Sequence, residues 1–99
     1  MKVNVNEKKI KVSCDNNDSA ETLTVSMEEC AELIQCVSKK LRGQEDPSHM
    51  EEEVADVLIG IHDLIYICDL NEDRIQRWVD LKQNRQLSRI GVKLDERNR

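Results

Sequence analysis

Two acidic stretches decide the fold of this chain: Met27-Glu28-Glu29-Cys30-Ala31-Glu32 and Glu51-Glu52-Glu53-Val54-Ala55-Asp56. Each contains a pair of carboxylates three residues apart in an apolar-rich segment, Glu29 with Glu32 and Glu53 with Asp56. Residues at this spacing are neighbours on one helix face. Twenty residues separate the pairs, which lets two helices run antiparallel and bring four carboxylates together. Such a cluster repels itself unless a cation lies within it, and Mg²⁺ is the hard ion that takes oxygen ligands.

The composition indicates one small domain and argues against nucleic acid or a membrane as its partner. The 99 residues fit a single domain, and so short a chain has a limited core of its own. The net charge of −5, without a basic stripe, argues against nucleic acid. The most apolar run, residues 54–68, is too short and too charged to span a membrane, and the N-terminus has no apolar leader. We therefore expect a cytoplasmic protein without a membrane partner.

The cysteines show neither a C-x-x-C motif nor zinc-like spacing. We expect all of them to be free thiols, most of them packed as small hydrophobic side chains in a reducing compartment: Cys14, Cys30, Cys36 and Cys68.

The first predicted helix begins at Asp18 or Ser19, where Asp18 and Glu21 fit a capping box, and it stops before Gly43. Its apolar residues recur at three and four and form one stripe: Leu23, Met27, Cys30, Ala31, Ile34, Val37 and Leu41. Glu29 and Glu32 lie on nearly the opposite side, among apolar neighbours. This pattern predicts that the carboxylates face a semi-enclosed site rather than open solvent.

The second predicted helix begins at Ser48, with Glu51 completing a capping box, and runs to about Leu70. It is apolar over most of its circumference, which is typical of a central, buried helix. A separate narrow strip carries the following residues: Glu53, Asp56, Gly60 and Asp63. Glycine in mid-helix costs roughly 1 kcal/mol relative to alanine, so Gly60 indicates either room for a ligand or a close helix contact.

A third helix is predicted from Glu72 to about Arg89, with Asn71 as its N-cap. A basic row follows one of its faces: Lys82, Arg85 and Arg89. Residues 1–12 alternate weakly between apolar and polar, which favours either a short β-hairpin or a mobile arm. The expected organisation is an arm or hairpin over residues 1–18, a helical domain over 19–90 and a polar tail over 91–99.

A single E-x-x-E pair on a helix usually lies on the solvated surface. Carboxylates on helices can also bind iron. The di-iron signature is Glu-x-x-His, but His49 follows Glu45 by four residues and His62 follows Glu53 by nine. We therefore expect both histidines to be ordinary polar residues.

The linked pattern of Glu29-x-x-Glu32, Glu53-x-x-Asp56 and Lys82-x-Asn84-Arg85 resembles the MazG-like branch of the all-α NTP pyrophosphohydrolases over roughly residues 22–90. The compact form is similar to small versions from phages and their bacterial hosts, which would place it in the host cytoplasm. The resemblance implies an all-α antiparallel bundle of three main helices, completed by homodimer or homotetramer formation. It also implies hydrolysis of nucleoside triphosphates, often deoxynucleotides, to the monophosphate and pyrophosphate, as nucleotide-pool housekeeping.

Several residue roles follow from the resemblance. The Mg²⁺ ligands would be Glu29, Glu32, Glu53 and Asp56, with Mn²⁺ as a substitute ion. Lys82, Asn84 and Arg85 would bind phosphate. A carboxylate that the metal does not fully engage would take the proton of the attacking water, with Glu28 and Glu32 as the candidates. Two further residues are weaker candidates for the substrate pocket: Asp63 and Trp78.

Two alternatives stay open at this point. Phosphoribosyl-ATP pyrophosphohydrolase shares the fold and the acids, but that family tends to place His four residues after the Asp, where this chain has Gly60. The second alternative is a non-enzymatic helical adaptor whose acids are surface charge or hold a structural cation.

Overall fold

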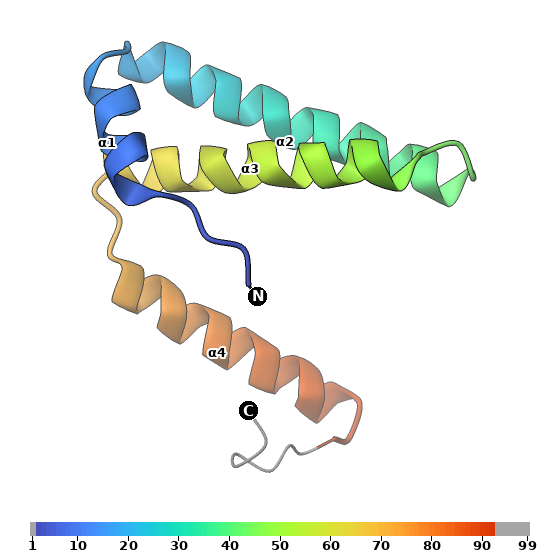
Figure 1. The fold of residues 1–99 in the computed structure, drawn as a ribbon. Helices are drawn as coiled ribbons and strands as arrows, with labels where there is room; N and C mark the ends of the chain where they lie inside the picture. The colour runs from blue at the N-terminus through green and yellow to red at the C-terminus, as the bar shows by residue number, and fades with distance from the viewer. Residues whose placement is uncertain (1, 93–99) are drawn as a thin grey trace.

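The computed structural model describes residues 2–92 and, within that range, contains four α-helices and no strand (Figure 1). The helices are α1 (Glu7–Asp15), α2 (Ser19–Leu41), α3 (Pro47–Ile67) and α4 (Glu72–Arg89). The all-α class is therefore confirmed. The predicted polar tail lies outside the described residues beyond Val92.

Helices α2 and α3 form an antiparallel hairpin whose caps follow from the local sequence. Asp18 caps α2 as predicted, since its side chain accepts a hydrogen bond from the Glu21 backbone N–H at 3.0 Å. At the other end, Gly43 adopts a left-handed φ of 72°. The Gln44 N–H then reaches the Lys39 carbonyl at 2.8 Å, which closes the helix in a Schellman turn.

Helix α3 begins one residue earlier and ends three residues earlier than the sequence predicted. Asp46, rather than Ser48, is the N-cap and accepts from the Ser48 N–H at 2.8 Å. Pro47 occupies the first helical position, where its missing N–H is no loss and its fixed φ suits the helix. The C-terminal end is set by Asp69, whose left-handed φ of 50° turns the chain away.

The prediction of a β-hairpin at the N-terminus is wrong, because α1 occupies half of residues 1–18 and the described residues there form no strand. Asn6 caps α1 by accepting from the Lys9 N–H at 3.0 Å. Ile10 and Cys14, four residues apart, share one face of α1 and are 7% and 6% exposed. Burying this face on α3 stabilises a helix that is too short to be stable alone.

A polar network ties α1 to the end of α3. The Tyr66 hydroxyl donates to Asp15 at 2.7 Å and accepts from the Lys11 ammonium at 3.0 Å. Lys11 also pairs with Asp15 at 2.9 Å. The chain therefore adds a helix to the hairpin where sequence periodicity indicated a strand or arm.

Asn71 is the N-cap of α4, as predicted. From there α4 extends away from α2 and α3 (Figure 1). Within residues 2–92 the packed helix pairs are α2 with α3 and α1 with α3. The predicted three-helix bundle is therefore not formed within one described chain. The surface of α4 agrees with this, since Trp78 is 58% exposed and no residue of the helix is buried.

The orientation of α2 departs from the simplest expectation for an amphipathic helix. Its main apolar stripe faces outward, with Met27, Ile34 and Leu41 all exposed. The acidic face, which also carries the buried Cys36, packs against α3 instead. Helix α3 is central, as predicted, because it contacts both α1 and α2, but several of its apolar residues are also exposed. Among the described residues, no helix has the length and apolar character needed to cross a bilayer.

Candidate metal and nucleotide site

Three of the four predicted metal ligands come together between α2 and α3. One carboxylate oxygen from each of Glu29, Glu53 and Asp56 lies within 4.8 Å of the other two. Glu29 projects from α2, whereas Glu53 and Asp56 lie one helical turn apart on α3. Glu53 is only 7% exposed, and the other two are half-buried. The hairpin therefore brings together residues that the sequence separates by more than twenty positions.

The negative charges of this acidic cluster repel one another. Burial raises the pKa of Glu29 to about 7, helped by its hydrogen bond to Asp56 and by the negative charges of Asp56, Glu32 and Glu53. Burial also raises the pKa of Glu53, and the charge of Glu32 adds to it. The cluster thus favours either a bound proton or a bound cation over three bare carboxylates.

Two oxygen atoms of the cluster lack hydrogen-bond partners among the described residues. Glu29 Oε2 and Glu53 Oε2 are both fully covered and accept no hydrogen bond. A buried polar atom without a partner carries a desolvation penalty of about 1–3 kcal/mol, more when charged. An all-oxygen donor set with unsatisfied atoms is what a hard divalent cation such as Mg²⁺ prefers. The residues present therefore fit a metal of this class.

The two candidate proton acceptors lie beside the acidic cluster rather than inside it. Glu32 is exposed, yet its charge is close enough to raise the pKa of both Glu29 and Glu53. Glu28 is exposed and takes no part in the cluster.

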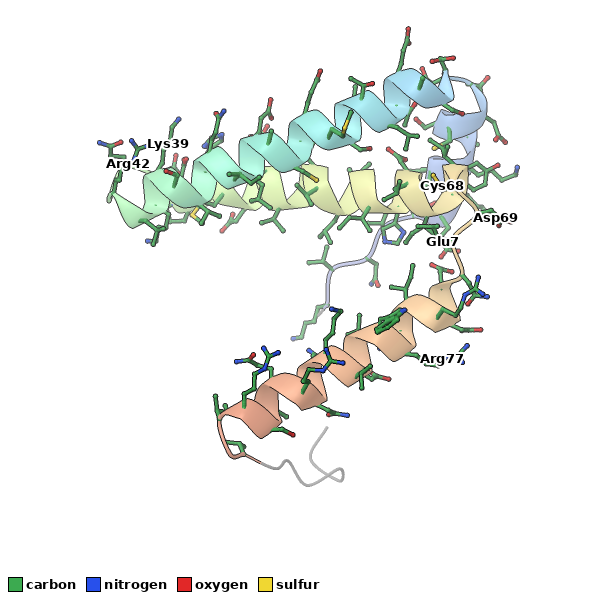
Figure 2. All side chains as sticks on the ribbon, turned by 180° about the vertical axis from the view of Figure 1, so that it is seen from behind. Glu7, Lys39, Arg42, Cys68, Asp69 and Arg77 are labelled. Atoms are coloured by element: carbon green, nitrogen blue, oxygen red, sulfur yellow. The ribbon has the colours of Figure 1, made fainter. Side chains whose placement is uncertain are left out.

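The predicted phosphate-binding residues are not brought to the acids within the chain. Lys82, Asn84 and Arg85 are exposed on α4, which does not pack against the hairpin. The Lys82 ammonium lies over the Trp78 ring, 6.0 Å from its centre. Figure 2 shows Arg77, on the same helix, well apart from Lys39 and Arg42 at the loop end of the hairpin.

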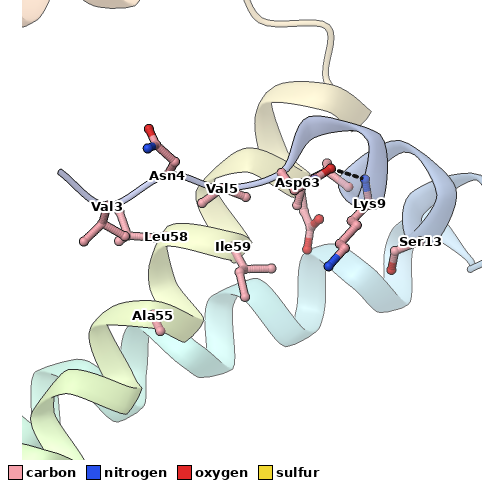
Figure 3. Close-up of a pocket in the computed structure, with 11 residues that line it drawn as sticks. Val3, Asn4, Val5, Lys9, Ser13, Ala55, Leu58, Ile59 and Asp63 are labelled. Carbon is pink, nitrogen blue, oxygen red and sulfur yellow. Dashed lines mark hydrogen bonds between the residues drawn. The ribbon is translucent and has the colours of Figure 1, made fainter. Parts of the chain in front are cut away.

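Asp63, a candidate for the substrate pocket, has a different setting from the other acids. Its carboxylate accepts a hydrogen bond from the Cys14 thiol at 3.3 Å. It also lines a cavity of about 450 Å³ between α3 and the N-terminal segment, together with mainly apolar side chains (Figure 3). Trp78 instead lines a shallow surface depression on α4 with Arg74, Arg77 and Leu81.

With this geometry in place, the comparison with protein families is decisive. The model of the MazG nucleotide pyrophosphohydrolase domain matches residues 18–98. The chain belongs to the MazG family. Searches of the curated proteins and of the solved structures each returned no match.

Membership of the MazG family makes this chain a nucleotide pyrophosphohydrolase in general terms, and therefore a hydrolase. The family is generally dependent on divalent metal ions, which agrees with the acidic donor groups between α2 and α3. The match begins at Asp18, the N-cap of α2, and does not include α1.

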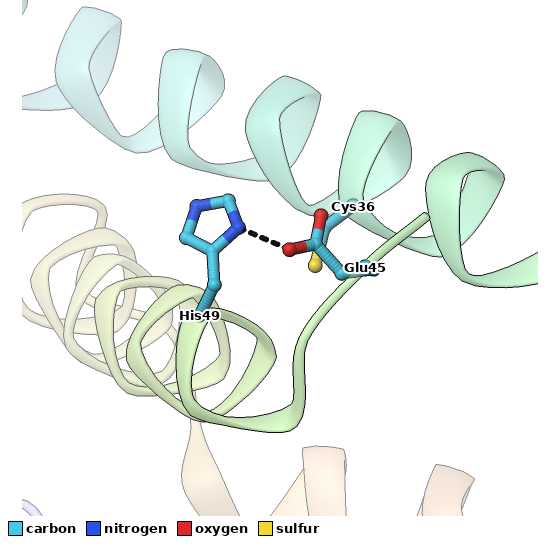
Figure 4. Close-up of side chains that lie close together, drawn as sticks. All are labelled: Cys36, Glu45 and His49. Atoms are coloured by element: carbon cyan, nitrogen blue, oxygen red, sulfur yellow. Dashed lines mark hydrogen bonds and ion pairs between the residues drawn. The ribbon is translucent and has the colours of Figure 1, made fainter. Parts of the chain in front are cut away.

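The MazG domain of this chain also contains a second cluster of ligand-type side chains, which the sequence did not reveal. Cys36, Glu45 and His49 each place one donor atom within 4.8 Å of the other two (Figure 4). His49 Nδ1 contacts Glu45, and His49 Nε2 lies 3.3 Å from Glu53 Oε1. The prediction that His49 is an ordinary polar residue therefore missed its position between the two clusters. The Asp46-Pro47 helix start would have been the signal, because it places Glu45 and His49 one turn apart.

Proposed function

We propose that this protein is a Mg²⁺-dependent nucleoside triphosphate pyrophosphohydrolase that converts (d)NTP and water to (d)NMP and pyrophosphate. In the cell it would serve nucleotide-pool housekeeping in the cytoplasm. One observation carries the proposal: a MazG domain whose Glu29, Glu53 and Asp56 converge with buried, unpartnered oxygens. Mn²⁺, which accepts similar oxygen ligands, is the expected substitute ion.

The metal would be held by Glu29, Glu53 and Asp56, with Glu32 completing the set when phosphates are bound. Its chemistry would be Lewis-acid polarisation of the triphosphate and a lowered pKa of bound water. The carboxylates in the contact between α2 and α3 would hold the ion, and through it the triphosphate, in a defined position, because they lie on helices rather than on loops.

Proton transfer falls to a carboxylate at the edge of the acidic cluster. Glu32 is the better candidate, because it is exposed to solvent yet near enough to influence Glu29 and Glu53. Glu28 is the alternative, one residue before Glu29 on the same helix. A general base must be within reach of the attacking water, and a position at the edge of the acidic cluster suits Glu32 to this role.

The phosphate-binding role proposed for Lys82, Asn84 and Arg85 requires α4 to lie near an acidic cluster. Within one chain α4 does not pack against the hairpin, so the acidic cluster would have to belong to another subunit. We propose that a homodimer or homotetramer supplies this contact. Two features support it: the outward-facing apolar stripe of α2 and the unpacked α4. Cationic side chains there would bind phosphate oxygens and offset the charge of the pyrophosphate leaving group.

The adaptor alternative conflicts with membership of an enzyme family. The phosphoribosyl-ATP alternative is disfavoured because Gly60 faces Ser26 at close range, which leaves no room there for a histidine side chain.

The decisive experiment measures pyrophosphate release from a panel of NTPs and dNTPs with Mg²⁺, with phosphoribosyl-ATP included. E53Q and D56N should abolish turnover and weaken Mg²⁺ binding. E52Q, which changes an exposed glutamate of the same helix, is the matched control and should keep both. No turnover of any nucleotide, together with unchanged Mg²⁺ affinity in E53Q and D56N, would refute the proposal. Turnover of phosphoribosyl-ATP alone would replace it with the rival activity.

A further inference from the structure

The second cluster assembles donor atoms from three separate parts of the hairpin. Cys36 lies near the C-terminal end of α2, Glu45 in the connecting loop and His49 in the first turn of α3. Figure 4 shows the thiol, carboxylate and imidazole turned toward one another. Because no two of these residues belong to the same segment, their convergence depends on the fold.

The interior of this cluster contains an atom that the protein leaves unsatisfied. The Glu45 side chain is only 5% exposed, and its Oε2 is buried without a hydrogen-bond partner among the described residues. Its other oxygen contacts His49 Nδ1 and accepts a hydrogen bond from the Asp46 N–H at 3.2 Å. Cys36 is 1% exposed, the most deeply buried side chain described. A buried carboxylate oxygen without a partner, next to a thiol and an imidazole, points to a ligand in the space between them.

The donor set identifies the class of ligand. Sulfur and nitrogen donors are poor ligands for Mg²⁺, whereas Zn²⁺ binds thiolate, imidazole and carboxylate at about 2.0–2.3 Å. Donor atoms bound to one such ion lie less than about 4.8 Å apart. The donor atoms of Cys36, Glu45 and His49 all lie within that distance of one another. We propose that Cys36, Glu45 and His49 form a Zn²⁺ site at the loop end of the hairpin, with a donor set distinct from that of the acidic cluster.

Access and proton balance are both compatible with such a site. The His49 side chain is 43% exposed, so one side of the cluster opens to solvent, and a water molecule would complete the tetrahedron. Binding exchanges the thiol proton of Cys36 for the metal–sulfur bond, and that proton leaves to solvent. The proton that His49 Nδ1 donates to Glu45 also leaves this contact, to Nε2 from the neutral ring or to solvent from the imidazolium, so that Nδ1 and the carboxylate each form a bond to the ion. No oxidation or reduction is involved.

The position of His49 links this site to Glu53. With Nδ1 on the metal, the remaining ring N–H is on Nε2, which lies 3.3 Å from Glu53 Oε1. A carboxylate that accepts from a metal-bound histidine is the usual outer partner in zinc sites and is held in place by it. The zinc site would therefore orient one oxygen of Glu53 and leave Oε2, the unpartnered atom, facing the acidic cluster. Glu53 is a positioning partner here rather than a zinc ligand.

The test uses Co²⁺ as a spectroscopic substitute for Zn²⁺ on the reduced, metal-free full chain. Only a thiolate ligand gives the sulfur-to-cobalt charge-transfer band, so ions in the all-oxygen cluster do not contribute to it. We expect the band to appear on Co²⁺ addition and to be displaced by Zn²⁺. It should be lost in C36S and strongly weakened in E45Q and H49Q.

The controls separate this site from other thiols and from the acidic cluster. C68S and C30S remove exposed thiols, and E29Q removes a ligand of the acidic cluster, so all of them should keep the band. E53Q should lower the Zn²⁺ affinity by about 10- to 100-fold, as expected for loss of an outer partner. Circular dichroism checks that each variant is folded, and E45Q, which keeps the shape of the side chain, tests the site if C36S unfolds. Absence of the band in the wild type, or its persistence in folded C36S or E45Q, would overturn the proposal.

Discussion

Substitution of Gly60 by alanine tests the close contact between the two helices that hold the acidic cluster. A Cβ atom at Gly60 would lie 3.3 Å from Ser26 Oγ, 3.4 Å from Ser26 Cβ and 3.5 Å from Ser26 Cα. The Ser26 hydroxyl is held there because its single proton is shared between the Thr22 carbonyl at 3.1 Å and the Gly60 carbonyl at 3.4 Å. Of the two interpretations that the sequence left open at Gly60, room for a ligand or a close helix contact, the structure shows the close contact, which is with Ser26 of α2.

Two opposing effects set the magnitude. Alanine gains roughly 0.5–1 kcal/mol over glycine in a helix interior, because glycine loses more backbone entropy on folding. Overpacking costs about 1–3 kcal/mol, and the present clash is at the low end because a shift of a few tenths of an ångström relieves it. The free energy of unfolding of G60A should therefore stay within about 1 kcal/mol of the wild-type value. In an S26A background the nearest atom is Ser26 Cβ at ordinary contact distance, so G60A should stabilise by roughly 0.5–1 kcal/mol.

The assay is urea denaturation followed by helical circular dichroism, at one protein concentration, for the wild type, both single variants and the double variant. The double-mutant cycle isolates the coupling between positions 26 and 60, and contacting residues typically show about 0.5–3 kcal/mol. G60L, whose side chain would run into the α2 backbone, is the positive control and should destabilise clearly. If G60A destabilises by more than about 2 kcal/mol in the S26A background as well, beyond what this contact explains, the clash is not with Ser26 and the packing argument is wrong.

Three further predictions concern the metal-free charge balance, the docking of α1 and the buried thiols. Glu29→Gln should raise the thermal midpoint of the metal-free protein, because it removes a charge that burial and Asp56 disfavour, and should reduce the further rise that Mg²⁺ produces. The hydrogen bond from Tyr66 and the contact with Lys11 hold the pKa of Asp15 below its ordinary value of 3.8. The resulting stabilisation is complete above that value and is lost as the pH falls through the lowered pKa, so acid titration of stability should be shallower in D15N. Alkylation with mass-spectrometric detection should modify exposed Cys30 and Cys68 in the folded protein and two thiols only after unfolding, namely Cys14, whose pKa burial raises to about 11, and Cys36.

Features set within one or two helical turns could be predicted from the sequence. Asp18 and Asn71 cap their helices as expected, and Gly43 ends α2, because each of these depends on residues at most four positions away. The failure at the N-terminus has the same origin. Residues 1–12 carry weak alternation, but a single helical face through Ile10 and Cys14 becomes favourable only when α3 is there to cover it. A nine-residue helix whose stability comes from tertiary contact leaves little trace in local periodicity.

The acidic cluster was predictable for a different reason. Glu29, Glu53 and Asp56 are placed by two regular helices and one turn, so spacing along the chain translates directly into proximity in space. The Cys36, Glu45 and His49 cluster has no such regularity, because Glu45 lies in the loop and its side chain folds back over the helix end. Spacing rules for metal sites describe ligands within one motif, and they do not extend to three ligands from three segments.

The position of α4 shows where inference from spacing stops. Lys82 and Arg85 share a face of α4 because they are three residues apart, yet this spacing says nothing of what that face meets. The four residues between α3 and α4 let the chain turn at Asp69, and the described packing gives α4 no apolar partner on the hairpin. Both α4, with exposed Trp78 and Leu81, and the hairpin, with the exposed stripe of α2, present apolar side chains to solvent. A second copy that covered both would remove these apolar side chains from water, so the two unpartnered surfaces favour the same self-association.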